Sequence, residues 1–183
     1  GYYARARNLH KCAKIVSNEL NGIFPSKQSE LQKLPGIGDY TSAAITSITF
    51  NRPSVVVDGN VERVMARYHM CPKQMPEAKK ALKQYAALYC VGFENRTGDY
   101  AQALMDLGAT ICTPKNPLCS FCPVNNSCQA YNKDTPDKYP LKKDKKKRPE
   151  RYGYVYFIGN NKGEILLHKR DEKGLLGGMI GLP

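Results

Sequence analysis

Four cysteines that lie close together in the sequence constrain the fold of this chain more than any other feature. They follow the spacing C-x6-C-x2-C-x5-C and are Cys112, Cys119, Cys122 and Cys128. Four thiolates in one loop can bind either a tetrahedral zinc ion or an iron–sulfur cluster. The spacing does not separate the two, and zinc is the first choice from the loop taken by itself.

The other cysteines do not form a second cluster of this kind. The chain has seven cysteines, and an odd number at uneven spacing argues against the disulfide framework of a small secreted protein. Clustered thiols are instead typical of a metal site in a reducing compartment. Cys12 and Cys90 fall within helical patterns, so we expect them to be small core residues, whereas Cys71 has no evident partner.

The charge of the chain indicates an anionic partner. The 183 residues carry a formal net charge of +12, and the sequence pI is about 9.4. Nucleic acid fits best, because side chains that neutralise phosphates release counterions and thereby drive binding. A basic protein that is merely soluble is the alternative interpretation. No stretch of the sequence is long and apolar enough to span a membrane.

Hydrophobic periodicity predicts a chain that is mainly α-helical. A short extended run, Ser54 to Val57, interrupts the helices, and Asp58 after it is expected to cap the next helix. The length suffices for one full core and part of a second domain. The expected helices span residues 9–20, 29–34, 40–50, 59–69, 76–90 and 95–111, and the cysteine-rich loop spans 112–128.

A glycine-containing turn separates two of the expected helices. Its sequence is Leu34-Pro35-Gly36-Ile37-Gly38. The two glycines allow a tight turn whose backbone N–H groups point outward at the start of the next helix, where the helix dipole favours an anion. Such a turn would hold a DNA phosphate without reading the base sequence, and Ile37 would anchor it in the core. An ordinary helix–helix turn is the alternative.

Asp58 is the second candidate site residue, at the end of the apolar run Val55-Val56-Val57. A carboxylate there is partly desolvated, yet the N-terminus of the following helix stabilises its ionised form. Such a group is suited to face a developing positive charge. Taken alone, the pattern favours a simple helix cap, and only the position of Asp58 after the glycine turn favours a catalytic role.

The composition changes after residue 131. The segment 132–151 is rich in lysine, arginine and proline, and we predict that it is an exposed linker. Beyond it, residues 154–158 and 164–168 are expected to form two strands joined at Gly159-Asn160-Asn161. These strands would begin a second domain.

The glycine turn, the segment Asp58-Gly59-Asn60 and the cysteine loop, in this order, resemble the helix-hairpin-helix superfamily of DNA glycosylases. The cysteine spacing is similar to the [4Fe–4S] loop of endonuclease III and the adenine glycosylases, and this resemblance favours iron over zinc. It implies a mainly α fold. Residues 1–131 would form a helix-hairpin-helix glycosylase domain that includes the iron–sulfur loop 112–128, residues 132–151 a basic linker, and residues 152–183 the truncated start of an α+β Nudix-like domain.

Three further details resemble the adenine DNA glycosylases of the MutY family. Residues 1–10 are similar to the segment that inserts a tyrosine beside 8-oxoguanine; Tyr2 has the position of that tyrosine, and Arg5 is expected to contact DNA. Tyr40 stands where endonuclease III-like lyases carry a Schiff-base lysine, so imine chemistry and strand cleavage are not expected. Residues 155–183 are similar to the start of the Nudix-like domain that recognises 8-oxoguanine.

This resemblance implies hydrolysis of the N-glycosidic bond of adenine mispaired with 8-oxoguanine or guanine in double-stranded DNA. The adenine leaves the base stack first, a glutamate upstream protonates it, and Asp58 stabilises the oxocarbenium ion, by analogy with glycoside hydrolysis. Tyr40 and Asn60 match positions that support Asp58 and the sugar. The hairpin residues expected to hold DNA are Leu34, Gly36, Ile37 and Gly38.

The sequence departs from the family pattern near its ends. No acidic residue stands in a motif that matches the upstream glutamate, so we expect this fragment to bind DNA but barely to catalyse, and to be poorly stable because apolar faces are exposed. Asp39 is unfavourable beside a phosphate unless it points away or caps the helix. We expect a monomer that is cytoplasmic and nucleoid-associated in a bacterium, and nuclear or mitochondrial in a eukaryote.

Two other interpretations remain open. One is an endonuclease III-like glycosylase that acts on oxidised pyrimidines, against which Tyr40 argues. The other is a non-catalytic DNA-binding module with a structural zinc ion. Colour separates a cluster from zinc, because a [4Fe–4S] protein is brown and a zinc protein is colourless.

Overall fold

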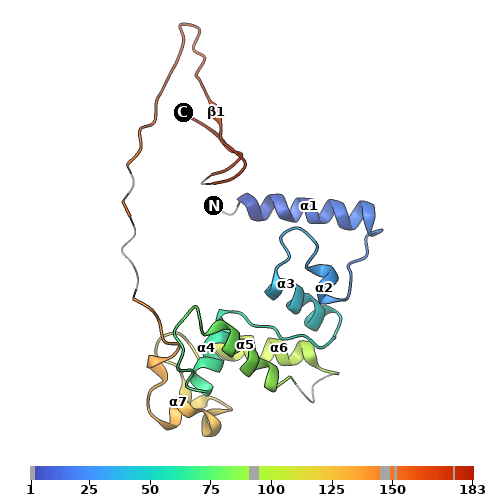
Figure 1. Ribbon diagram of the computed structural model, residues 1–183, viewed down its shortest axis with the longest axis vertical. Coiled ribbons are helices and arrows are strands. Elements are labelled where there is room, and N and C mark those ends of the chain that lie inside the picture. Colours follow the sequence, from blue (N-terminus) through green and yellow to red (C-terminus); the bar gives the residue numbers. More distant parts are fainter. Residues whose placement is uncertain (1–2, 91–94, 145–148, 151, 175) are drawn as a thin grey trace.

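The computed structural model of the chain describes residues 3–90, 95–144, 149–150, 152–174 and 176–183. The described part is mainly helical, as the sequence predicts. Figure 1 shows α1 at one side of α2 and α3, with α4 to α7 gathered at the other end of the molecule. The predicted wedge residue Tyr2, Leu175 and the basic residues 145–148 and 151 lie outside the described residues.

The N-terminal elements form a helix-hairpin-helix. Helix α1 spans Tyr3–Glu19, α2 spans Gln28–Leu31, and α3 spans Asp39–Ala44. The predicted helix over 40–50 is therefore α3 together with the π-helical segment η1, Ile45–Thr49, which continues it directly. Cys12 and Val16 of α1 pack with Leu31 and Leu34 in one buried cluster, which joins α1 to the hairpin.

The second group of helices holds the larger core. It contains α4 (Gly59–Tyr68), α5 (Lys79–Leu88) and α6 (Thr97–Asp106), and α6 continues as the π-helical segment η2 (Leu107–Ile111). The predicted helix over 76–90 thus begins three residues late. The buried apolar side chains of this core come from α4, α5 and the turns beside them, and are Val61, Val64, Met65, Ala66, Cys71, Ala78, Leu82 and Ala86.

The cysteine-rich loop contains only short turns of helix. They are η3 (Cys119–Phe121), η4 (Asn125–Ser127) and α7 (Gln129–Asn132), followed by η5 (Pro136–Lys138). The structure corrects the start of the predicted exposed linker, because residues 136–143 lie against the helical domain. The Met75 N–H donates to the Leu141 carbonyl at 2.8 Å, and Lys143 pairs with Glu77 at 2.6 Å.

The C-terminal segment forms a hairpin that differs from the prediction. The expected strands over 154–158 and 164–168 are wrong: these residues meet only through the isolated bridge between Gly159 and Ile165 and the hydrogen bonds beside it. In the described residues the strands are β1 (His168–Lys169) and β2 (Ile180–Gly181), which pair antiparallel. The apolar side chains of 154–158 are exposed, so no second layer stabilises longer strands there.

Across the described residues, no helix has the length and apolar character needed to cross a membrane. Several large apolar side chains nevertheless remain exposed on the helical elements. Leu9, Ile23 and Leu88 are 71%, 72% and 65% exposed. Exposed apolar side chains in these numbers are consistent with the expected low stability of the chain by itself.

A close backbone contact fixes η2 against α4. A Cβ atom added to Gly108 would lie 2.6 Å from the Asn60 Cβ and 3.0 Å from the Asn60 Cα and carbonyl oxygen. These distances are shorter than real side chains allow, and part of the clash is with backbone. The approach of the two segments therefore requires glycine at this position.

We predict that Gly108→Ala lowers the free energy of unfolding by about 1–3 kcal/mol, because η2 must move away from α4. Urea denaturation followed by circular dichroism measures this change. Gly153→Ala is the matched control: the added methyl group meets no atom within 4 Å, so its effect should stay within about 0.5 kcal/mol. Equal stability of the two variants would contradict the prediction.

Candidate active site and metal centre

The hairpin places its glycines at the surface and its apolar residues inside. Gly36 and Gly38 are exposed, Leu34 is buried, and Ile37 packs against the cluster of α1 and α2. Gly36 has a positive φ of 79°, and a Cβ there would lie 2.9 Å from the Asn8 Cβ. The glycine thus allows α1 to lie against the turn. The predicted DNA-binding side chain of Leu34 is instead part of the core, and only its backbone is available to a phosphate.

Asp39, which seemed unfavourable beside a phosphate, is held by three side chains. Its Oδ1 accepts hydrogen bonds from Gln28 Nε2 and Gln32 Nε2, each at 3.3 Å, and its Oδ2 pairs with Lys83 Nζ at 2.6 Å. The Lys83 ammonium balances the negative charge. Both members of the ion pair are well exposed, so their contribution to stability is small.

Tyr40 lies on α3 and contacts α6. Its side chain is 44% exposed, and its hydroxyl donates to Met105 Sδ at 3.6 Å. No hydrogen bond joins Tyr40 to Asp58 among the described residues, so the structure does not bring these two predicted residues into direct contact. Arg5 on α1 is exposed.

Asp58 and Asn60 do come together, at the N-terminus of α4. Asp58 is the N-cap residue, and its Oδ1 accepts the Val61 N–H at 2.8 Å, as the sequence predicts. Its Oδ2 accepts a hydrogen bond from Asn60 Nδ2 at 3.1 Å. The carboxylate is half-buried and held by two donors and the positive end of the helix dipole, all of which favour its ionised form.

Arg63, one turn further along α4, connects Asn60 with the segment that leads to the cysteine loop. Its guanidinium donates to Asn60 Oδ1 at 2.9 Å and to the carbonyls of Gly108 and, at 2.7 Å, Cys112. Burial lowers the pKa of Arg63 from its ordinary value, yet an arginine remains charged at neutral pH. The side chain of Asn60 is therefore fixed on both sides, by Asp58 and by Arg63.

Arg67 holds the two ends of the cysteine loop together. It is only 2% exposed, and it donates to the Thr113 carbonyl at 2.7 Å and the Pro136 carbonyl at 2.8 Å. A further bond runs to Cys112 Sγ at 3.3 Å. The remaining bonds of the guanidinium are to the carbonyls of Tyr139 and Pro114.

Neither arginine was identified from the sequence. In a chain this basic, an arginine on a helix is first interpreted as a surface charge. The available signal was spacing: Asn60, Arg63 and Arg67 are three and four residues apart, so they share one face of α4.

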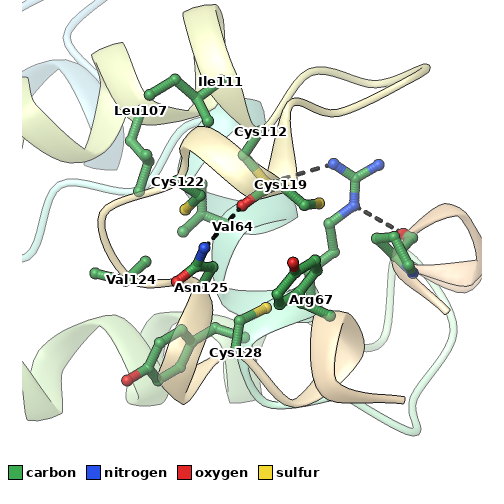
Figure 2. Close-up of a pocket in the computed structure, with 13 residues that line it drawn as sticks. Val64, Arg67, Leu107, Ile111, Cys112, Cys119, Cys122, Val124, Asn125 and Cys128 are labelled. Atoms are coloured by element: carbon green, nitrogen blue, oxygen red, sulfur yellow. Dashed lines mark hydrogen bonds between the residues drawn. The ribbon is translucent and has the colours of Figure 1, made fainter. Parts of the chain in front are cut away.

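The four predicted metal-binding cysteines line one pocket (Figure 2). Burial is the main cause that raises the pKa of the Cys119 and Cys122 thiols, so a bound metal would have to stabilise their thiolates. Within the described parts of the chain, no three Cys, His, Asp or Glu side chains are arranged to hold a metal ion. The loop therefore gathers the four thiols around one space without closing them on a single ion.

The fold and these sites are those of a helix-hairpin-helix DNA-repair protein. Residues 1–100 match the HhH-GPD superfamily base excision DNA repair protein family, and the chain belongs to this superfamily. It is 38% identical over 175 residues to the adenine DNA glycosylase of Buchnera aphidicola subsp. Baizongia pistaciae (strain Bp). That match covers 96% of this chain and 49% of the relative, so the chain spans about half the length of the relative.

Two solved structures support the fold. A thermostable thymine-DNA glycosylase is 33% identical with a TM-score of 0.60, covering 70% of this chain and 59% of that chain. The endonuclease III in a non-covalent complex with DNA is 28% identical with a TM-score of 0.57, covering 73% of this chain and 60% of that chain. These similarities confirm the mainly helical glycosylase fold.

We predict that Arg67→Met lowers the free energy of unfolding by about 2–4 kcal/mol, because buried carbonyl groups at both ends of the loop lose their donor. Urea denaturation measures the change. Arg96→Met is the control, since the Arg96 side chain is 74% exposed. Similar losses in both variants would mean that the buried guanidinium does not secure the loop.

Proposed function

We propose that the chain is the central part of an adenine DNA glycosylase that removes adenine mispaired with 8-oxoguanine or guanine. The family membership and the relative of this name support the proposal. The reaction would be hydrolysis of the N-glycosidic bond after the adenine has left the base stack. Double-stranded DNA is accordingly the proposed partner of this basic chain.

The observation that carries the proposal is the environment of Asp58. Its carboxylate is half-buried at a helix N-terminus, and its two oxygens are oriented by the Val61 N–H and the Asn60 amide. A negative charge held in one place can stabilise the oxocarbenium ion that forms as the glycosidic bond breaks. Water would then attack the sugar from the open side.

The hairpin and Tyr40 would have supporting roles. The exposed backbone at Gly36 to Gly38 is suited to hold a phosphate and so to fix the DNA relative to Asp58. Tyr40 is exposed on the helix that follows the hairpin, where the sugar of the extruded nucleotide would pass. It offers no amine for imine formation, which favours a monofunctional glycosylase over an endonuclease III-like lyase.

We further propose that the two ends of the chain recognise the base opposite the adenine. The segment 1–10 would place Tyr2 and Arg5 against the DNA. Residues 152–183 would begin a Nudix-like domain that contacts 8-oxoguanine, with the linker before it reduced to the part that follows Lys143. The hairpin of β1 and β2 is consistent with the β part of such a domain.

A [4Fe–4S] cluster is the proposed occupant of the cysteine pocket. The donor set of four thiols around one space fits such a group. A cluster is larger than one ion, so its thiolates stand farther apart than the ligands of zinc, which agrees with thiols that surround a pocket without meeting at a point. When bound, the cluster would stabilise the loop as a structural element. The positive charge of Arg67 beside Cys112 would favour the thiolate form.

We expect Asp58→Asn in the full-length protein to reduce adenine release roughly 10²–10³-fold, because the charge that faces the developing cation is lost. Asparagine caps a helix as well as aspartate does, so the fold should remain. Single-turnover release of adenine from a duplex with an adenine·8-oxoguanine pair measures the effect. Asp99→Asn, at an exposed carboxylate paired with Arg96, should retain the rate. Unchanged release by Asp58→Asn would exclude the assigned role.

We expect the protein purified without oxygen to be brown and to contain iron and inorganic sulfide in equal amounts. Cys128→Ser should lose the visible absorption, because one of the four thiols is removed. Cys90→Ser is the control, since Cys90 bonds to the Ala86 carbonyl outside the loop. A colourless protein that contains zinc instead of iron would replace the cluster by a structural zinc site.

A further inference from the structure

The C-terminal hairpin lies on the first turns of α1. Arg7 Nη1 donates a hydrogen bond to the Gly177 carbonyl at 3.0 Å, although the two residues are 170 positions apart in the sequence. Arg7 Nε also lies 4.0 Å from Glu172 Oε2. Figure 1 shows the C-terminal segment, orange to red, running back along the molecule to the beginning of α1.

The part of the hairpin that Arg7 contacts is a compact turn over residues 171–178. The Gly178 N–H donates to the Asp171 carbonyl at 2.9 Å, and the Arg170 N–H donates to the Met179 carbonyl at 2.9 Å. Gly177 is buried, whereas the neighbouring described residues 171–174 and 176 are exposed. The turn is therefore closed internally, and its one buried carbonyl has a charged donor from another part of the chain.

The hydrogen bond matters more than the ion pair. The Glu172 side chain is 68% exposed, so its pairing with Arg7 is screened by solvent. A hydrogen bond from a guanidinium to a buried carbonyl is charge-assisted and stronger than a neutral one. Asn8, the next residue of α1, lies against Gly36 of the helix-hairpin-helix. Adjacent residues of α1 thus contact the DNA-binding hairpin and the C-terminal turn.

We propose that Arg7 is a positioning residue that docks the turn 171–178 on α1 and thereby sets the specificity for the base opposite the adenine. This inference rests on the proposed function, in which the segment 1–10 and residues 152–183 both contact that base. Arg7 need not touch DNA itself. It keeps the two contacting segments in a fixed relation, so that one 8-oxoguanine can meet both of them.

Hydrogen–deuterium exchange of the chain tests the docking without any activity. In Arg7→Ala, the amides of the turn should exchange roughly tenfold faster than in the unchanged protein, because a charge-assisted hydrogen bond that opposes opening is lost. Arg7→Lys keeps one charged donor and should restore part of the protection. Lys14→Ala, at an exposed lysine of the same helix, should leave the turn unchanged. Equal exchange in Arg7→Ala and the unchanged protein would overturn the docking.

Adenine release by the full-length protein tests the specificity. Arg7→Ala should lower the ratio of the rate opposite 8-oxoguanine to the rate opposite guanine, with the rate opposite guanine retained and Arg7→Lys intermediate. A fall of both rates together would mean a merely structural role and would overturn the specificity claim. An unchanged ratio despite faster exchange would do the same. If the unchanged protein releases no adenine, the proposed function fails and the specificity claim with it, while the exchange data still decide whether Arg7 docks the turn.

Discussion

The buried guanidinium group of Arg67 is the interaction on which the second half of the structure depends. An uncompensated charge at 2% exposure would be very costly, and here carbonyl groups and a thiol from both ends of the cysteine loop surround it. The same helix carries Asp58 at its N-terminus, with Asn60 and Arg63 between them. One helix of ten residues therefore orients the proposed catalytic carboxylate and closes the proposed metal loop.

The fold was predictable from the sequence where periodicity and capping agree. The helices around Val16, Val61 and Leu82 have clear apolar faces, and Asp58 caps α4 as expected. The beginning of α5 was predicted three residues too early, because proline is favoured in a first helical turn but does not by itself fix where the helix begins. The strands over 154–168 were wrong, since alternation of apolar residues stabilises a strand only when another layer covers it.

The site was predictable as a set of motifs and not as a set of contacts. The spacing of the cysteines indicated one shared pocket, and the structure brings all four to it. Whether Tyr40 faces Asp58, and that Leu34 faces inward, depend on how α3 packs against α1 and α6, which local patterns do not specify. The contacts of Arg7, Arg63 and Arg67 join residues far apart in the chain, so only the folded chain brings them together.

The π-helical segments carry a consequence for how this chain can vary. Such a turn holds one residue more than an α-helical turn, and η2 ends at Ile111, immediately before Cys112. Removing a single residue from 107–111 would let the segment relax to an α-helix and rotate everything after it by about 100°. The thiol of Cys112 would then turn away from the guanidinium that holds it. This junction should therefore tolerate replacement of side chains far better than any change in its length.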